Sequence, residues 1–310
     1  MRAVALGAFL ARAALTGVRA AAIPALDRTN FRGRTVSLAG GPALAVSASA
    51  SAALGAGSRP LAGAALVAGL GAGAVGLYDD VVGGRPEHQA KGFRGHLSAL
   101  REGRVTSGLA KIVGVGAAGL AAAALLPGQP APSARFAALK PAVFLPRSAR
   151  REPAPGLDQQ GGAGQSRRRR AAPAHSLSWR GAVNTLLGAG VIAGTANLVN
   201  LLDLRPGRAL KAGVLIGAPL GGVAAGPVGA AAALLPADLG EEIMLGDAGA
   251  NALGALLGVA LAARTGPVGR ALLLAGLAGL TAASEKVSFT KVIESTPGLR
   301  ELDALGRRAP

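Results

Sequence analysis

The sequence predicts an all-α fold, a polytopic bundle of about eight or nine transmembrane helices. Half of the 310 residues are hydrophobic and 16% are charged, whereas about 25% are charged in typical soluble domains. The charges are also segregated, and uncharged runs cover 35–57, 60–78, 112–134, 181–202, 212–237, 248–263 and 271–284. Most of these runs approach the ~20 residues that cross a hydrocarbon core of ~30 Å. Their abundant Ala and Gly suit close helix packing in lipid.

The first segment, residues 1–23, has two interpretations. Its basic start and the small residues near its end are typical of a signal peptide. However, Arg12 and Arg19 interrupt its apolar region. They lie one heptad apart, on one face of a helix, where they could snorkel to an interface or look into the bundle. We therefore expect a retained first span.

Composition divides the chain into four parts. Residues 1–127 contain N-terminal transmembrane helices and a loop that follows an Asp pair, and residues 181–284 contain C-terminal transmembrane helices. Residues 128–180 are rich in Pro, Gly, Gln and Arg, which predicts a disordered linker. Residues 285–310 are expected to form a cytoplasmic amphipathic tail, in which Asp303 should contribute almost nothing to activity.

The chain carries a formal net charge of +17 and contains no cysteine. In a soluble protein such a charge, together with the Arg run at 167–170, would suggest nucleic-acid binding. In a membrane protein, basic loops orient the spans and meet anionic lipid headgroups, so we expect membrane contact and no nucleic acid. The lack of cysteine excludes disulfides and thiol chemistry.

Acidic residues stand at the ends of apolar runs, where a charge is costly and therefore a candidate for function. Asp79 and Asp80 end one run in GLYDD, Asp203 ends another, and Asp247 opens a third in MLGDAGANALG. Helix capping or hydration would explain any one of them alone. Several that converge on one membrane face would repel one another, and Mg²⁺ offsets such repulsion while it leaves room for substrate phosphates.

Two asparagines accompany the acid in NLVNLLDLRPGR (197–208). Asn197, Asn200 and Asp203 are three residues apart, so on a helix their side chains fall within one sector of about 120°. This spacing suits a polar site at the end of a span. Asparagine can also act only as a hydrogen-bonding link between membrane helices, and that alternative stays open.

The topology between Asp203 and Asp247 is restrictive. If the two acids share one membrane face, an even number of crossings must lie between them, yet residues 210–237 provide only about 28 residues, enough for one full span. Either two short or re-entrant helices occupy this stretch, with its glycines and Pro219 allowing the break, or the site is split.

Three motifs in this order resemble one family. YDD at the end of a span, NLVNLLD at the end of another and MLGDAGANALG at the start of a third are similar to motifs of the polyprenyl-phosphate N-acetylhexosamine-1-phosphate transferases. These glycosyl transferase family 4-like proteins include phospho-N-acetylmuramoyl-pentapeptide transferase. RTNFRGRTVSLAGG also resembles the first cytoplasmic loop of that family. The likeness covers most of residues 24–265, without 128–180.

The resemblance implies a phosphotransferase of cell-envelope glycan synthesis in the plasma membrane, with its active-site loops in the cytoplasm. Such an enzyme uses Mg²⁺ to move a sugar-1-phosphate from a nucleotide-diphosphate sugar to a polyprenyl phosphate. It implies catalytic roles for Asp79 and Asp80, as base or nucleophile, and metal ligation by Asp247 and Asp80. The substrate-binding candidates are Lys91, Lys111, Asn197, Asn200, Asp203, Arg205 and Arg208.

The chain departs from the family at three places, the first of which is Ala250, where the family has serine. After the asparagines it has Arg205 and Arg208 where the family has small and acidic residues, which could refit the loop to another head group. The His-rich late loop is missing, and the only histidines are His88, His96 and His175. The alternative function is therefore a catalytically silent relative that acts as a membrane scaffold or lipid-binding partner. We favour the enzyme, and a homodimer is an open alternative for its assembly.

Overall fold

The structure is a computed structural model that describes residues 1–83, 98, 101, 103, 106–126 and 179–308. Residues 1–127 and 179–310 form one compact unit, and the description below concerns that unit alone. The predicted linker at 128–180 lies almost wholly outside the described residues, as do Lys91 and the three histidines.

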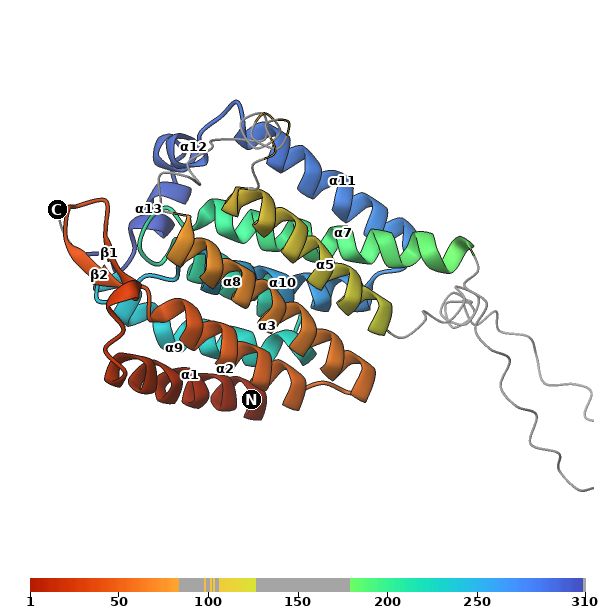
Figure 1. Ribbon diagram of the computed structural model, residues 1–310, viewed down its shortest axis with the longest axis horizontal. Coiled ribbons are helices and arrows are strands. Elements are labelled where there is room, and N and C mark those ends of the chain that lie inside the picture. Colours follow the sequence, from red (N-terminus) through yellow and green to blue (C-terminus); the bar gives the residue numbers. More distant parts are fainter. Residues whose placement is uncertain (84–97, 99–100, 102, 104–105, 127–178, 309–310) are drawn as a thin grey trace, which may run out of the picture. The chain divides into compact units, whose positions relative to one another are not determined.

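The unit is built from helices, with one short hairpin (Figure 1). The hairpin pairs β1 (Asp27–Thr29) with β2 (Thr35–Ser37) in antiparallel register. The helices are α1 (Arg2–Ala20), α2 (Gly40–Leu54), α3 (Arg59–Val82), α5 (Ser107–Leu125), α7 (Trp179–Leu202), α8 (Arg208–Gly217), α9 (Ala225–Leu239), α10 (Gly246–Arg264), α11 (Pro267–Ser284), α12 (Phe289–Ser295) and α13 (Leu299–Ala304).

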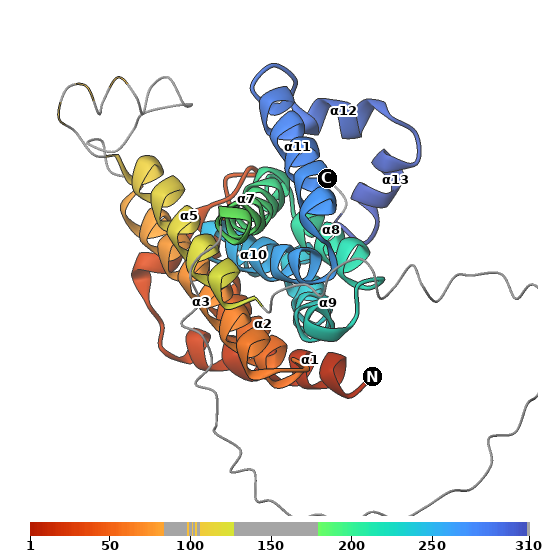
Figure 2. The same cartoon turned by 90° about the vertical axis from the view of Figure 1, so that its right-hand side faces the viewer.

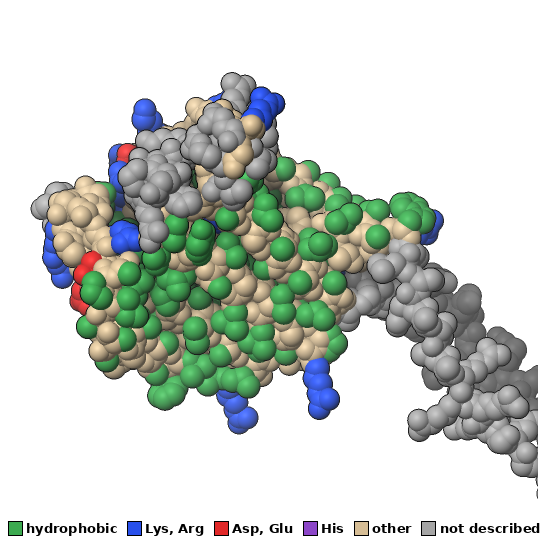
Figure 3. Space-filling model, viewed as in Figure 1, with side chains coloured by type: hydrophobic (Ala, Val, Ile, Leu, Met, Phe, Trp, Pro, Cys, Tyr) green, Lys and Arg blue, Asp and Glu red, His purple; other side chains and the backbone are tan. Residues whose placement is uncertain are grey.

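Seven helices within the described residues are long and apolar enough to cross a membrane: α1, α3, α5, α7, α9 with the 3₁₀ turn before it, α10 and α11. Hydrophobic side chains dominate the helical surface shown in Figure 3. These helices confirm the expected all-α membrane bundle. The finer count of eight or nine spans stays a prediction, because α2 has 15 residues and α8 has 10.

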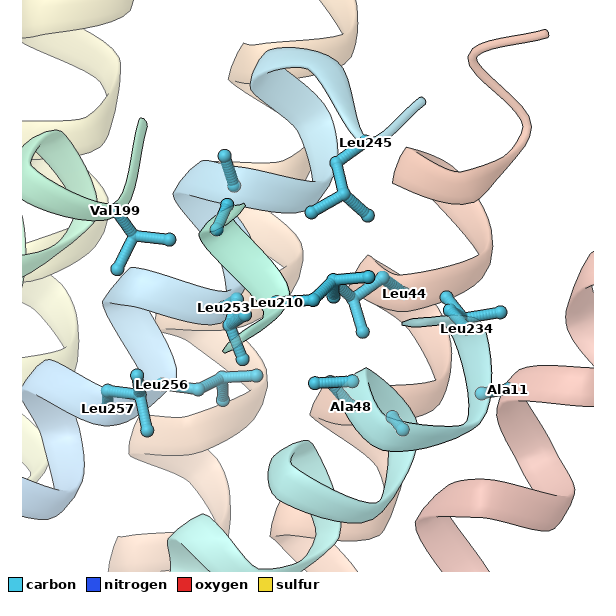
Figure 4. Packing of buried hydrophobic residues seen from close by; sticks show 14 of the residues in the cluster. Ala11, Leu44, Ala48, Val199, Leu210, Leu234, Leu245, Leu253, Leu256 and Leu257 are labelled. Carbon is cyan, nitrogen blue, oxygen red and sulfur yellow. The ribbon is translucent and has the colours of Figure 1, made fainter. Parts of the chain in front are cut away.

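Helix α10 is the centre of the bundle and packs against α2, α3, α7 and α8 (Figure 2). Every residue from 248 to 260 is buried. Glycines let the α7 backbone approach it, since a Cβ on Gly254 would lie 2.5 Å from the Thr195 carbonyl oxygen. In lipid, close van der Waals packing of this kind drives helix association. Leucines complete the core between α2, α8, α9 and α10, among them Leu44, Leu210, Leu234, Leu253 and Leu256 (Figure 4).

The stretch 210–237 resolves the topological problem. Helix α8 leaves the end of the bundle at which α7 finishes, the chain breaks after Gly217, and α9 returns. Gly221 and Gly222 have φ of 54° and 52°, a left-handed backbone that favours glycine. Of the alternatives left open by the sequence, the structure has two short helices, and Asp203 and Asp247 come to the same end of the bundle. The hairpin, α12 and α13 lie at that end as well (Figure 1).

Candidate functional site

Three spans bring two carboxylates and one ammonium group together. Asp79 lies in the last turn of α3, Asp247 is the second residue of α10, and Lys111 is in the first turns of α5. The Lys111 Nζ atom lies 2.9 Å from Asp79 Oδ2 and 2.7 Å from Asp247 Oδ2. Each of the three side chains retains some exposure, between 13% and 24%. We call Asp79, Asp80, Lys111, Asp203 and Asp247 the carboxylate cluster.

The start of α5 explains where Lys111 lies. Thr106 precedes the helix in an extended conformation, and its Oγ1 accepts a hydrogen bond of 3.2 Å from the Leu109 backbone N–H. This is an N-cap, which satisfies a backbone donor that the first helical turn leaves free. Lys111 therefore lies one turn inside this span, and its ammonium group lies beside Asp79 in the last turn of α3.

Asp80 binds the N-terminus of the central helix α10, whereas Asp79 and Asp247 pair with Lys111. Its Oδ1 accepts a 2.9 Å hydrogen bond from the Asp247 backbone N–H, and its Oδ2 accepts one of 2.9 Å from Ala248 N–H. A carboxylate at a helix N-terminus satisfies free N–H groups and interacts favourably with the helix dipole. Arg28 of β1 donates to the Asp80 carbonyl oxygen. Asp80 thus joins the end of α3 to the start of α10 and to the hairpin.

Two glycines permit this close approach. Gly246 has φ of 59°, and a Cβ there would lie 2.8 Å from Asp80 Oδ1. A Cβ on Gly76 of α3 would lie 2.3 Å from the Asp247 carbonyl oxygen. Side chains at either position would push α3 and α10 apart, so these glycines let the Asp pair reach the N-terminus of α10.

Asp203 lies immediately after α7 and is half-buried. Burial, and then the nearby carboxylates of Asp238, Asp247 and Asp80, raise the pKa of Asp203 well above that of an ordinary carboxyl group. The backbone N–H of Gly246 opposes part of this rise. A proton is therefore retained more readily at Asp203 than at an exposed aspartate.

A pocket of about 190 Å³ adjoins Asp203, between the hairpin loop, the 203–206 loop and the segment after α9. The exposed ring of Phe31 marks its edge, with the Arg205 guanidinium carbon 4.9 Å from the ring centroid. Glu241 is buried in its wall and accepts a 2.8 Å hydrogen bond from Asn30 Nδ2. The pocket is lined by Thr29, Asn30, Phe31, Val36, Asp203, Leu204, Arg205, Pro206, Asp238, Glu241, Ile243 and Met244.

Asn30, Phe31 and Glu241 were missed as site residues from the sequence. Asn30 and Phe31 stand in RTNFRGR, a segment noted only for its likeness to a family loop. Glu241 stands in the polar segment before Asp247, and its φ of 54° is unusual for a residue other than glycine. Both segments are polar stretches between apolar runs, but nothing in the sequence singles out these three residues within them.

Other predicted site residues have different partners. Asn197 Nδ2 donates a 3.0 Å hydrogen bond to Thr281 Oγ1 of α11. Asn197 thus links two membrane helices, which was the alternative to a role in the site. Asn200 is half-buried, and its carbonyl oxygen accepts from the Asp203 backbone N–H at 3.1 Å. Arg208 is buried, and its guanidinium pairs with Asp303. Asp303, which was expected to be an unimportant residue of the tail, is therefore one half of a buried ion pair.

The donor chemistry of the cluster fits Mg²⁺ in part. Asp79 and Asp247 converge on one cationic group, and carboxylate oxygens are the ligands that Mg²⁺ takes, often only one or two of them together with substrate phosphates. The Lys111 ammonium holds the position between them. Among the described residues, no group of three or more His, Cys, Asp or Glu side chains is arranged to hold a metal ion.

A scan against protein-family models and a search of the curated proteins gave no match to this chain. The resemblance of its three motifs to a transferase family therefore rests on the motifs themselves, and any argument for function rests on the residues of the cluster and the adjoining pocket.

Proposed function

We propose that this protein is an integral membrane transferase. It moves a sugar-1-phosphate from a nucleotide-diphosphate sugar to a polyprenyl phosphate, at the cytoplasmic face of the plasma membrane, in cell-envelope glycan synthesis. The observation that carries the proposal is the convergence of Asp79, Asp247 and Lys111 from three spans on one point. Charges inside membrane helices are costly, and such convergence is typical of a functional site.

The lipid substrate is supported by where the cluster lies. Tyr78 precedes Asp79 and Ile112 follows Lys111, and the two apolar side chains are 48% and 50% exposed. We infer that the cluster lies close to a surface that lipid would cover. A polyprenyl chain lying along α3 and α5 would bring its terminal phosphate to the level of Lys111, whose ammonium suits a phosphate group.

The proposed reaction is a phosphoryl-type displacement. An oxygen of the lipid phosphate attacks the sugar-proximal phosphorus, and a new P–O bond forms. The bond from that phosphorus to the bridging oxygen breaks, and a nucleoside monophosphate leaves. Asp79 accepts the proton where the lipid phosphate carries one, and a two-step path with Asp79 as nucleophile is the alternative. Lys111 offsets the negative charge that gathers on the phosphate oxygens.

Mg²⁺ would be held by Asp247 with Asp79 beside it, and it would supply positive charge to the diphosphate. Asp80, the other ligand suggested by the sequence, has both oxygens engaged by the start of α10, and we assign it to positioning Asp247. Asp203 and Arg205 would contact the nucleotide part from the adjoining pocket. Asn200 and Lys91 stay candidates, whereas Asn197 and Arg208 are engaged elsewhere.

A second candidate function is a silent scaffold or lipid-binding partner. The ion pairs of Lys111 with Asp79 and Asp247 favour it, because they satisfy the charges without any ligand. The absence of a His-rich loop from the sequence favours it as well. The two functions differ in one measurable outcome, which is turnover.

The test uses the full chain in lipid nanodiscs with polyprenyl phosphate and a panel of nucleotide-diphosphate sugars. Release of nucleoside monophosphate is measured with Mg²⁺ and with a chelator. We expect release that depends on Mg²⁺, on the lipid and on Asp247, and that survives Glu285→Gln, which removes an exposed acid. Lipid binding without release for any donor would establish the scaffold instead.

A further inference from the structure

We propose that the segment 289–307 is a positioning element for the 203–207 loop, and that Asp303 is its central positioning residue. This loop carries Asp203 of the carboxylate cluster and Arg205 of the pocket. The inference rests on the proposed function for its catalytic consequence, but its structural content stands on the following contacts alone.

The principal contact is a buried pair between Arg208, the first residue of α8, and Asp303 of α13. Arg208 Nε donates to Asp303 Oδ1 at 2.8 Å, and Arg208 Nη2 donates to Asp303 Oδ2 at 2.9 Å. The exposed fractions of the two side chains are 5% and 7%. Arg208 Nη1 also donates to Thr290 Oγ1 of α12 at 2.9 Å. Two parallel bonds between planar groups fix orientation as well as distance.

Further contacts tie the segment to the loop itself. Arg307 Nε donates to the Pro206 carbonyl oxygen at 2.9 Å, and Arg307 Nη2 binds Asp303 Oδ1 at 2.6 Å. Lys211 Nζ donates to the carbonyl oxygens of Leu302, Asp303 and Leu305, at 2.7 to 2.9 Å. Asp303 therefore orients two arginines: Arg208, which begins α8, and Arg307, which binds the loop at Pro206.

The loop is also held by α9. Gly207 N–H donates to Asp238 Oδ2 at 2.5 Å, and Gly207 has φ of 75°. A Cβ at Gly207 would lie 2.4 Å from Leu239 Cδ2, so the loop packs directly against the end of α9. Held both by α9 and by the 289–307 segment, residues 203–207 have little freedom to move.

This arrangement has a consequence for the cluster. Asp203 is three residues from Pro206 and five from Arg208, so release of the Asp303 contacts would free the loop that holds its carboxyl group. A purely anchoring role for α12 and α13 would instead affect the stability of the whole bundle. The two roles therefore differ in where the backbone becomes mobile.

The test is hydrogen–deuterium exchange of the full chain in nanodiscs, compared for wild type, Asp303→Asn and the matched control Glu285→Gln. Asp303→Asn keeps the size of the side chain and removes its charge. We expect exchange in 203–208 to rise by about tenfold or more, with no change in α10, because a buried charge has lost its partner. Glu285→Gln should leave both regions unchanged.

Unchanged exchange in 203–208, or an equal rise in α10, would overturn the proposal. If Asp303→Asn does not fold, Arg307→Gln decides the question by the same comparison, since it removes the bond to Pro206 and spares the Arg208 pair. In an active preparation, Asp303→Asn should lower kcat about tenfold or more and leave KM for the lipid unchanged. A protein with no turnover sinks the proposed transferase, and the exchange result still decides the positioning role.

Discussion

Two groups of charged side chains lie at the same end of the bundle and have opposite charge compositions. The carboxylate cluster combines four acids with one lysine, and its ion-paired side chains keep 13% to 24% exposure. The Asp303 group combines one buried carboxylate with Arg208, Arg307 and Lys211. The cluster has an excess of acids over its single cation, Lys111, which pairs with two of them. A carboxylate enclosed by cations is satisfied already and serves the fold.

The largest effect that this comparison predicts is on turnover at Asp247. Asp247→Asn keeps the side chain's size but removes the charge that would bind a cation. We expect nucleoside monophosphate release to fall by at least ~10²-fold, since one electrostatic stabiliser is typically worth ~3–4 kcal/mol in the transition state. If Asp247→Asn and Glu285→Gln behaved alike in an active preparation, the cluster would not be the reaction site.

A second prediction separates the groups by stability. Asp303→Asn should lower the free energy of opening residues 203–208 by about 3 kcal/mol and leave that of α10 unchanged, because the guanidinium of Arg208 loses its partner beside this loop. Replacing both by apolar residues, Arg208→Met with Asp303→Leu, should recover most of that loss. Hydrogen–deuterium exchange in nanodiscs measures both effects. A large loss in Asp247→Asn, with a small one in Asp303→Asn, would reverse the comparison.

The two groups should also respond to pH in opposite directions. Burial raises the pKa of Asp303, but hydrogen bonds and charges from Arg208 and Arg307 outweigh it and lower the pKa overall. Its stabilisation is therefore present above the ordinary carboxyl pKa and is lost as the pH falls through the lowered folded pKa.

For Asp203, the folded pKa is raised, so its stabilisation is present below the ordinary carboxyl pKa and is lost as the pH rises through the raised value. Stability curves over pH for wild type, Asp203→Asn and Asp303→Asn check both signs. Asp203→Asn, which stays uncharged, should be more stable than wild type at neutral pH. A less stable Asp203→Asn would show that its carboxylate is satisfied in the folded protein.

The smallest effect concerns Asn197, which belongs to neither group. Its 3.0 Å hydrogen bond to Thr281 joins α7 to α11. Asn197→Ala should lower stability by about 1 kcal/mol, the usual size of such a link in a membrane bundle, and should leave turnover unchanged. Thr281→Val is the matched control and should cost about as much. A selective loss of turnover in Asn197→Ala would return this residue to the site.

Much of the cluster was predictable because acids at the ends of apolar runs are rare. Asp79, Asp203 and Asp247 stood out on that ground, and the two-helix solution for 210–237 followed from the requirement that they share a face. The pocket was less predictable, since Asn30, Phe31 and Glu241 are ordinary loop residues until the hairpin brings them beside Asp203. Arg208 and Asp303 are 95 residues apart, and nothing local indicates that they pair.

By itself, the sequence determined that the chain is a helical membrane bundle and which acids are candidates for chemistry. Both follow from the distribution of charges along the chain, because the cost of a charge in lipid depends on local composition. Only the tertiary structure decided which acid meets which partner. That Asp80 binds the α10 N-terminus, Asp247 binds Lys111 and Asp303 binds Arg208 depends on close approach of helices far apart in sequence. Ion pairs and hydrogen bonds require their atoms to lie within a few ångströms, and the packing of the helices decides which atoms come that close.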